Sequence, residues 1–202
     1  ELEKLKINFI IVLEKTDYIT INAIEKYKSN MLFQVDKGYG DAILLGIKNV
    51  KTKYFSIFNA DGSFDPYELE GMYSQIKNNS LDLLLASRYK KNASSEDDTL
   101  ITLIGNKIFT LLGKIFFSLP ISDILYTYVM GDTQKILDLN LKQKDFTLCV
   151  ELPIKAKKNG LNIADISARE KSRIGGTKKV NEFKDGFLIL IHMIRLFLNN
   201  ER

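Results

Sequence analysis

The sequence of 202 residues contains a single cysteine, Cys149, and a single histidine, His192. One cysteine excludes an intrachain disulfide and a cysteine-cluster metal site, and one histidine excludes multi-histidine zinc chemistry. The sequence also lacks an uninterrupted apolar run of about 18 residues or more, and no signal peptide precedes the first predicted strand. These absences predict no membrane-spanning helix and favour a reducing, cytoplasmic setting.

The composition is that of a folded, soluble domain. Hydrophobic residues make up 45% of the sequence and charged residues 27%, which excludes a disordered chain. The net charge of +4 is compatible with an anionic ligand or surface. Because no repeat or internal linker is evident, residues 1–202 are predicted to form a single domain.

Apolar runs typical of strands alternate with segments of helical periodicity in the first half of the sequence. The predicted strands begin at residues 7, 31, 54 and 81, and the predicted helices span residues 16–29, 41–50 and 66–78. This alternation predicts βαβ units and an α/β fold with a mostly parallel sheet flanked by helices. In the second half, helices are predicted at residues 100–119, 133–139, 146–159 and 181–199, short strands at 126–131 and 161–168, and loops at 90–98 and 169–179.

The strand that begins at Tyr54 ends on two polar residues, Asn59 and Asp61. Acidic side chains at the carboxyl end of a central strand lie where open α/β sheets bind ligands. We therefore predict that Asp61 binds a hard divalent cation that neutralises a diphosphate leaving group. Asn59 offers a second, uncharged oxygen, or it serves only to form the turn. Asp65, which precedes a proline, is predicted to cap the next helix.

A glycine-containing segment, residues 37–42, lies between a predicted strand and a predicted helix. Glycines at a helix N-terminus let backbone amides approach a phosphate, so Lys37 and Gly38 are candidate donor-binding residues. Read as a Gly-x-Gly-x-x-Gly motif, the segment lacks the third glycine, because Ile43 stands in its place. Asp61 nevertheless lies about twenty residues after the segment, where a dinucleotide-binding fold places the acid that contacts the ribose. A tight turn that requires positive φ is the alternative.

Three further side chains are candidate site residues. Arg88 ends the strand that begins at residue 81, on the same sheet edge as Asp61, and its guanidinium suits bidentate contact with a phosphate. The alternative for Arg88 is an ion pair with an acidic neighbour. Asp123 follows a helix break, and the alternative to a site role is that it caps a helix. Glu151 lies in an apolar helix, where a carboxylate needs either a partner or a role in proton transfer.

The loop at residues 169–179 carries five basic side chains and one acidic side chain. With Gly175 and Gly176 as a hinge, this loop is predicted to be an anion clamp that closes over a ligand, in which Arg173 and Lys178 contact phosphate. A solvated basic loop is the alternative. Nucleic-acid binding is not expected, because no aromatic residue is interleaved with these charges.

The predicted C-terminal helix, residues 181–199, is too apolar on all sides for an ordinary surface helix. Lys184, Asp185 and Arg195 interrupt it, and its apolar part is too short to cross a bilayer. We expect one face to pack on the sheet and the rest to cover the helix at residues 100–119. A compatible alternative is that the helix lies on a membrane surface.

Taken together, these segments resemble the family 2 glycosyltransferases of GT-A fold, most closely the branch that includes the dolichyl-phosphate mannose synthases. The matching segments are residues 37–42, 59–66, 86–89, 105–107 and 122–125, Phe146 with Glu151, and residues 173–179. The resemblance implies transfer of a sugar from a nucleoside diphosphate donor, usually with inversion and with Mg²⁺ or Mn²⁺. It also implies that Asp61 binds the metal, that Arg88, Arg173 and Lys178 contact phosphate, and that Asp123 and Glu151 face the acceptor.

The sequence departs from the family pattern in four places. Asn59 stands where the first acid of Asp-x-Asp is expected, residues 123–129 lack the usual glycine and arginine, and residues 12–16 lack an acid that commonly helps to hold the nucleotide base. The βα unit with which relatives begin has no counterpart before residue 7. We therefore expect the chain as given to lack this unit.

Two hypotheses follow from the resemblance. The first is an inverting glycosyltransferase, which Asp61 and the basic loop favour; the second is a degenerate GT-A domain that binds a sugar nucleotide or a partner without turnover, which Asn59 and Val129 favour. A nucleotide-cofactor oxidoreductase remains a third. For the first, the predicted partners are a nucleoside diphosphate sugar and a polyprenyl phosphate or saccharide acceptor, and the predicted location is the cytoplasm with peripheral contact to the inner face of the membrane.

Overall fold

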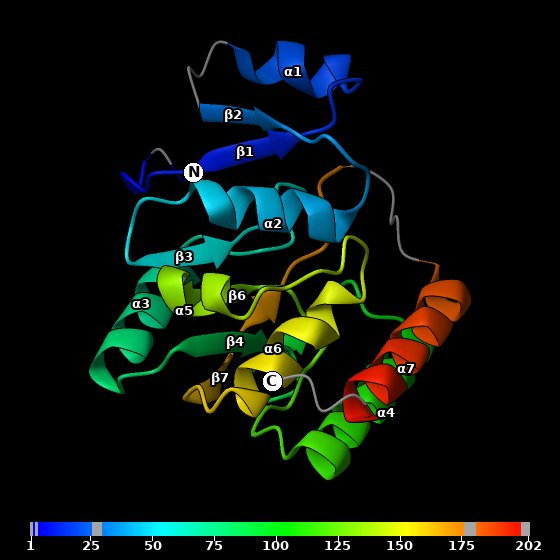
Figure 1. Ribbon diagram of the computed structural model, residues 1–202. Helices are drawn as coiled ribbons and strands as arrows, with labels where there is room; N and C mark the ends of the chain where they lie inside the picture. Colours follow the sequence, from blue (N-terminus) through cyan, green and yellow to red (C-terminus); the bar gives the residue numbers. More distant parts are fainter. Residues whose placement is uncertain (1, 3, 26–29, 176–180, 199–202) are drawn as a thin grey trace.

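A computed structural model describes residues 2, 4–25, 30–175 and 181–198, and Figure 1 shows how their helices and strands are arranged. In chain order the elements are β1 (Ile10–Leu13), α1 (Tyr18–Ile24), β2 (Asn30–Phe33), α2 (Tyr39–Asn49), β3 (Tyr54–Ile57), α3 (Glu68–Asn78), β4 (Leu83–Ser87) and β5 (Ser94–Ser95). They continue with α4 (Leu100–Phe117), β6 (Val129–Asp132), α5 (Thr133–Asp138), α6 (Leu148–Lys158), β7 (Ile163–Ser167), β8 (Arg169–Glu170) and α7 (Glu182–Leu198). The predicted α/β class is confirmed.

The central sheet has four strands in the order β3-β6-β4-β7. β4 and β7 pair in parallel, whereas β6 runs antiparallel to both β3 and β4. Two-stranded parallel sheets are formed by β1 with β2 and by β5 with β8. The prediction of a mostly parallel sheet is therefore corrected at β6, because a short apolar run carries no signal for the direction of its strand.

The buried strand β4 separates two apolar clusters. Because side chains alternate between the faces of a strand, Leu83 and Leu85 pack in one cluster and Leu84 and Ala86 in the other. Residues of α3 join the cluster around Leu84, whereas residues of α5, α6 and α7 join the cluster around Leu83. Helices thus cover both faces of β4, as its continuous apolar sequence predicts.

Each predicted helix and strand has a counterpart among the described residues, with ends that differ by a few positions. The helix predicted from Pro66 begins at Glu68, because the Asp65 carboxylate accepts a hydrogen bond from the Tyr67 amide and holds a preceding turn. The predicted polar loop at residues 90–98 contains β5, which pairs with β8 at the start of the predicted basic loop. These two loops are therefore joined by backbone hydrogen bonds.

Helix α4 corrects the prediction that no segment resembles a membrane span. Within the described part of the chain, it is the one helix long and apolar enough to cross a membrane by length and composition, and 17% of its residues are buried. Lys107 and Lys114 interrupt its apolar sequence, which is why no uninterrupted run was evident. Most of α4 is therefore exposed or only partly buried.

Candidate active site

Asp61 lies in the turn that follows β3, at the carboxyl edge of the strand. Its Oδ1 accepts hydrogen bonds from the Ser63 amide at 3.0 Å and the Ser63 hydroxyl at 2.6 Å, which fixes the carboxylate. Its Oδ2 lies 3.7 Å from Nη1 of Arg173, and its backbone oxygen accepts a hydrogen bond from the Ile174 amide at 2.8 Å. The structure therefore brings together Asp61 and Arg173, two residues that were predicted separately.

The described part of the basic loop is held by acidic side chains. Arg173 donates from Nε to Oδ2 of Asp97 at 3.1 Å, and Lys171 forms an ion pair with Asp65 at 3.0 Å. The Ser172 amide donates to Glu96 at 3.1 Å. Arg173 is thus positioned beside Asp61, and the predictions for Gly176 and Lys178 concern positions outside the described residues.

Asn59 is engaged by a tyrosine of the glycine-containing segment. The hydroxyl of Tyr39 lies 3.0 Å from Oδ1 of Asn59 and 2.7 Å from the hydroxyl of Thr127. Since the tyrosine has one proton and donates it to Asn59, Thr127 must donate to Tyr39. Burial raises the pKa of Tyr39 to about 12, which keeps the hydroxyl protonated at neutral pH. The ring stacks on Phe146 with centroids 4.9 Å apart.

The two glycines of this segment pack against the backbone of residues 143–145. A Cβ atom on Gly38 would lie 2.2 Å from the carbonyl oxygen of Lys144, and one on Gly40 would lie 2.4 Å from that of Gln143. Gly38 also has φ of 124°, and the Asp41 amide donates to Lys144 at 3.0 Å. Close packing therefore accounts for the glycines, as in the turn alternative, and the phosphate contacts predicted for Lys37 and Gly38 stay predictions.

We predict that Gly38→Ala lowers the free energy of unfolding by about 1–3 kcal/mol, because a side chain at this φ is strained and meets a backbone oxygen. Gly71→Ala is the matched control, since nothing lies within 4 Å of its Cβ position inside the exposed face of α3. In that helix the change should raise stability by about 0.5–1 kcal/mol. Urea unfolding of the two variants measures both effects, and equal stabilities would contradict the packing of Gly38.

Arg88 lies in a buried network of carboxylates. Its Nε and Nη2 donate to the two oxygens of Asp123 at 2.8 and 3.1 Å, and its Nη1 donates to Asp98 and Glu170, each at 3.3 Å. Asp123 is fully buried. The ion-pair alternative for Arg88 is therefore the arrangement found, and its predicted phosphate contact would require these bonds to be exchanged.

Glu151 is also buried and fully engaged. Its carboxylate accepts hydrogen bonds from the amides of Lys142 at 3.1 Å and Gln143 at 2.9 Å, and it pairs with Lys155 at 2.9 Å. These bonds hold the same loop on which Gly38 and Gly40 pack. The contacts of Glu151 thus give it a positioning role in this structure, and the acceptor-side role predicted for it stays a prediction.

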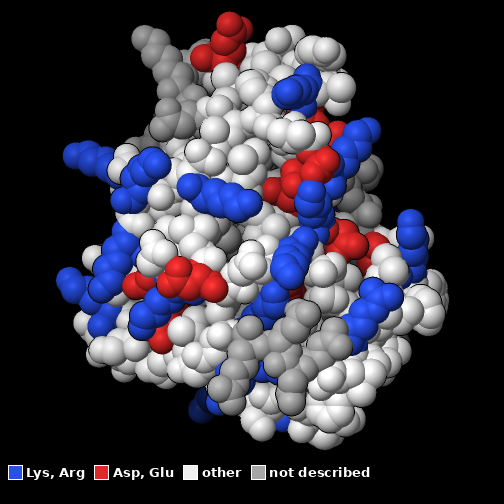
Figure 2. All heavy atoms as spheres, viewed as in Figure 1, with Lys and Arg blue, Asp and Glu red and all other residues white. Residues whose placement is uncertain are grey.

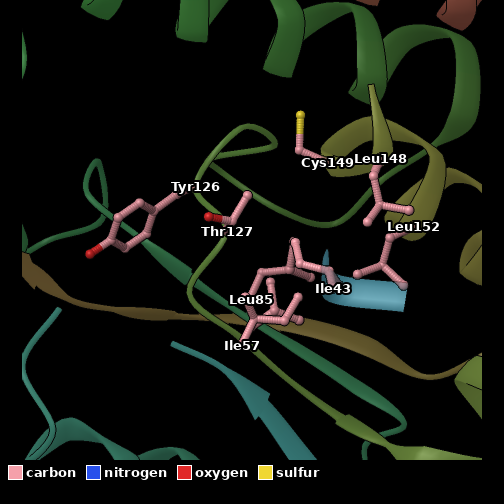
Figure 3. A pocket seen from close by; sticks show the side chains of 9 residues that line it. Ile43, Ile57, Leu85, Tyr126, Thr127, Leu148, Cys149 and Leu152 are labelled. Atoms are coloured by element: carbon pink, nitrogen blue, oxygen red, sulfur yellow. The ribbon is translucent and has the colours of Figure 1, made fainter. Parts of the chain in front are cut away.

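Two hollows lie near these groups. Figure 3 shows the first, which lies between Ile43 of α2, Leu148 and Cys149 of α6, and Thr127, and which is lined mainly by apolar side chains. Burial raises the pKa of Cys149 to about 12, so its thiol is no nucleophile at neutral pH. The second hollow, of about 340 Å³, extends from Arg88 to Leu100 at the start of α4.

Asp61 and Asn59 suit a divalent cation only if further oxygen ligands complete its coordination. Among the described residues, no group of three or more His, Cys, Asp or Glu side chains is placed to hold a metal ion. Asp61 offers one carboxylate and Asn59 one amide oxygen, which already accepts from Tyr39. Mg²⁺ is commonly held by one or two carboxylates together with substrate phosphates, so these residues fit a cation that arrives with a diphosphate.

Sequence reasoning missed three residues of the site, Tyr39, Asp97 and Thr127. Tyr39 lies between Gly38 and Gly40, and Asp97 lies in the acidic run of residues 96–98, so a local sequence pattern marks both positions. Thr127 had none, because it is 88 positions from Tyr39 in the sequence.

The sequence is similar to a protein family and to several curated proteins. The sequence model of the family described as Glycosyl transferase family 2 matches residues 3–137. A UDP-N-acetylglucosamine–dolichyl-phosphate N-acetylglucosaminyltransferase of Methanococcus voltae is 29% identical over 174 residues, which cover 77% of this chain and 66% of the relative. An uncharacterized protein of Methanocaldococcus jannaschii is 26% identical over 170 residues, covering 79% of this chain and 70% of the relative. The chain thus spans about two thirds of the length of these relatives.

Solved structures share the fold at low identity. Glucosyl-3-phosphoglycerate synthase from Mycobacterium tuberculosis in complex with UDP matches with a TM-score of 0.70 and 12% identity, over 93% of this chain and 68% of that one. Residues 1–349 of S. aureus TarS in complex with UDP-GlcNAc match with a TM-score of 0.61 and 15% identity, over 98% of this chain and 60% of that one. Both likenesses concern the fold alone.

Proposed function

The chain belongs to glycosyl transferase family 2, and from this premise we propose that it transfers a sugar, with inversion, from a nucleoside diphosphate donor to a polyprenyl phosphate. The observation that carries the proposal is the Asp61 carboxylate, fixed at the carboxyl edge of β3 and facing Arg173. The Methanococcus voltae relative is named as an N-acetylglucosaminyltransferase with UDP-N-acetylglucosamine and dolichyl phosphate as its substrates, which supports the same donor and acceptor classes.

The donor would bind at this edge through its diphosphate. Asp61, with Asn59 beside it, would hold Mg²⁺ or Mn²⁺, and the bound cation would neutralise the charge of the departing diphosphate. Two solved structures of similar fold contain Mn²⁺ together with UDP or with UDP-glucose, which supports this assignment. Arg173 lies against Asp61 and Asp97, and in this proposal it would contact the diphosphate once a cation neutralises Asp61.

The contacts of Asp123 and Glu151 favour an acceptor that is already anionic. A hydroxyl acceptor needs a general base, but Asp123 is paired with Arg88 and Glu151 is saturated by two amides and Lys155. A phosphate monoester carries about 1.5 to 2 negative charges at neutral pH and can attack without losing a proton to the protein. In this proposal Asp123 and Glu151 position their neighbours, and the acceptor-side roles predicted for them stay predictions.

The test is transfer of radiolabelled sugar from UDP-N-acetylglucosamine, with Mn²⁺, to a polyprenyl phosphate in detergent. We expect label in the organic phase, and no transfer to a soluble alcohol or saccharide. Transfer to the saccharide alone would overturn the acceptor class. The second candidate function is a domain that binds a sugar nucleotide without turnover, which the hydrogen bond from Tyr39 to Asn59 favours. Binding of the UDP-sugar without transfer to any acceptor would support this candidate.

Asn59→Asp is expected to tighten Mn²⁺-dependent donor binding by about tenfold, because a second carboxylate would face the cation. The new carboxylate can still accept the hydrogen bond of Tyr39, so the local geometry should be kept. Isothermal titration with UDP and Mn²⁺ measures the change, and Tyr39→Phe, which frees the Asn59 oxygen, is the companion variant. Weaker binding by Asn59→Asp would contradict the placement of the cation beside Asn59.

A further inference from the structure

Arg173 lies between two carboxylates, and the two ends of its guanidinium contact different ones. Its Nε donates to Oδ2 of Asp97 at 3.1 Å, whereas its Nη1 lies 3.7 Å from Oδ2 of Asp61. A guanidinium is planar and carries five N–H groups in a fixed fork, more than two carboxylate contacts use. The bond at Nε therefore turns the Nη end of Arg173 toward Asp61.

The backbone on both sides of Arg173 is bound to the turn that contains Asp61. The Ile174 amide donates to the backbone oxygen of Asp61 at 2.8 Å, and the Lys171 amide donates to that of Ser63 at 2.9 Å. Arg173 stands between these two bonds, so the main chain sets the place of its Cα atom beside the turn. What remains to be set is the direction of its side chain.

Asp97, which bonds to that side chain, belongs to a loop that is itself bound to the segment before Arg173. β5 pairs with β8, and the Glu96 amide donates to the backbone oxygen of Glu170 at 3.0 Å. In return, the Ser172 amide donates to the Glu96 carboxylate at 3.1 Å. Asp97 is thus held at a fixed place next to the basic loop, although it lies 76 positions from Arg173 in the sequence.

An ion pair alone does not assign a role to Asp97. Such pairs are common on this surface, because most acidic side chains on the face shown in Figure 2 lie beside basic ones. The side chains of Arg173 and Asp97 are 28% and 26% exposed, and pairs with this much exposure contribute little to stability. A bond that orders a long side chain in advance does, however, lower the entropic cost of its contact with a ligand.

We propose that Asp97 is a positioning residue of the donor site, which holds the guanidinium of Arg173 with its Nη end toward the diphosphate. This role rests on the proposed function, since the ligand is the diphosphate of the sugar nucleotide. When a cation neutralises Asp61, Arg173 keeps its bond to Asp97 and meets the diphosphate through its Nη groups. The role differs from the predicted clamp, which closes over the ligand, because Arg173 is held in place before the donor arrives.

The test compares two variants that remove the same charge, Asp97→Ala and Asp97→Asn, by isothermal titration of the full chain with UDP and Mn²⁺. Only asparagine still offers an oxygen to Nε of Arg173. Asp97→Ala should therefore bind UDP about 3- to 10-fold more weakly than Asp97→Asn. The matched control is the same pair of changes at Asp138, an exposed residue of α5 that accepts from Gln134 at 2.8 Å, and these two variants should bind UDP equally.

A double-mutant cycle tests whether Asp97 acts through Arg173. In an Arg173→Met background no guanidinium remains to be oriented, so Asp97→Ala and Asp97→Asn should bind UDP equally. A difference that persists in this background would overturn the positioning role, because Asp97 would then act on the structure of the loop.

Nitrogen-15 relaxation of the Arg173 side chain, measured on the full chain with no nucleotide added, separates this role from the proposed function. The Nε–H signal, identified by its loss in Arg173→Met, should be rigid in the parent and in Asp97→Asn, and mobile in Asp97→Ala. A rigid Nε–H in a parent that does not bind UDP would refute the donor site, and the role of Asp97 with it. UDP binding by a parent with a mobile Nε–H, or equal binding by the two Asp97 variants, would overturn the role of Asp97 alone.

Discussion

Asp61→Ala is expected to reduce sugar transfer by about 10²–10³-fold, because the variant loses the carboxylate at the carboxyl edge of β3 that faces Arg173. Without it, a cation bound to the diphosphate would lack a charged protein ligand at this position, and the charge of the leaving group would be less neutralised. The loss should appear in kcat/KM, measured with UDP-N-acetylglucosamine and Mn²⁺.

Two controls separate this effect from a loss of structure. Asp61→Asn keeps the size of the side chain and the acceptor for Ser63 and should be nearly as inactive, because the charge is what the cation requires. Glu70→Gln, on the exposed side of α3, should retain full activity. Full activity of Asp61→Ala, or of the parent chain in EDTA, would rule out the metal role of Asp61.

Arg88→Met is expected to lower the free energy of unfolding by about 3–5 kcal/mol, because it removes the only cation that bridges three buried or nearly buried carboxylates in the described structure. Asp123 would then be left with uncompensated charge in the core. Urea unfolding, followed by circular dichroism, measures the loss.

Asp123→Asn in the Arg88→Met background should recover part of that loss, since the neutral amide no longer carries an unpaired charge. Lys90→Met is the control for an exposed ion pair: Lys90 binds Asp165 at 2.8 Å but is 38% exposed, so its removal should cost at most about 1 kcal/mol. Similar costs for Arg88→Met and Lys90→Met would contradict the structural role of the buried network.

Local sequence signals predicted the parts of the fold that depend on neighbouring residues. The apolar run of β4 is buried on both faces, and the turn after β3 places Asp61 at the sheet edge. The alternation of strands and helices likewise gave the α/β class. Each of these features is decided by side chains within a few positions of one another.

The partners of the site residues could not be predicted in the same way. Asp123 is 35 positions from Arg88, and Thr127 is 88 positions from Tyr39, so only the folded sheet brings them together. β6 runs antiparallel to β3 and β4, and nothing within its own four residues indicates that direction. The exposure of α4 was missed because a helix with so many apolar residues is usually buried, and its burial depends on which elements pack against it.

Isothermal titration of UDP in the presence and absence of Mn²⁺, on the parent chain and on Asp61→Ala, tests the central claim most directly. The account predicts that the parent chain binds UDP with Mn²⁺, that EDTA weakens binding strongly, and that Asp61→Ala binds no better with Mn²⁺ than without it. Equal binding by the parent and the variant, or binding that Mn²⁺ leaves unchanged in both, would contradict a donor site built on Asp61.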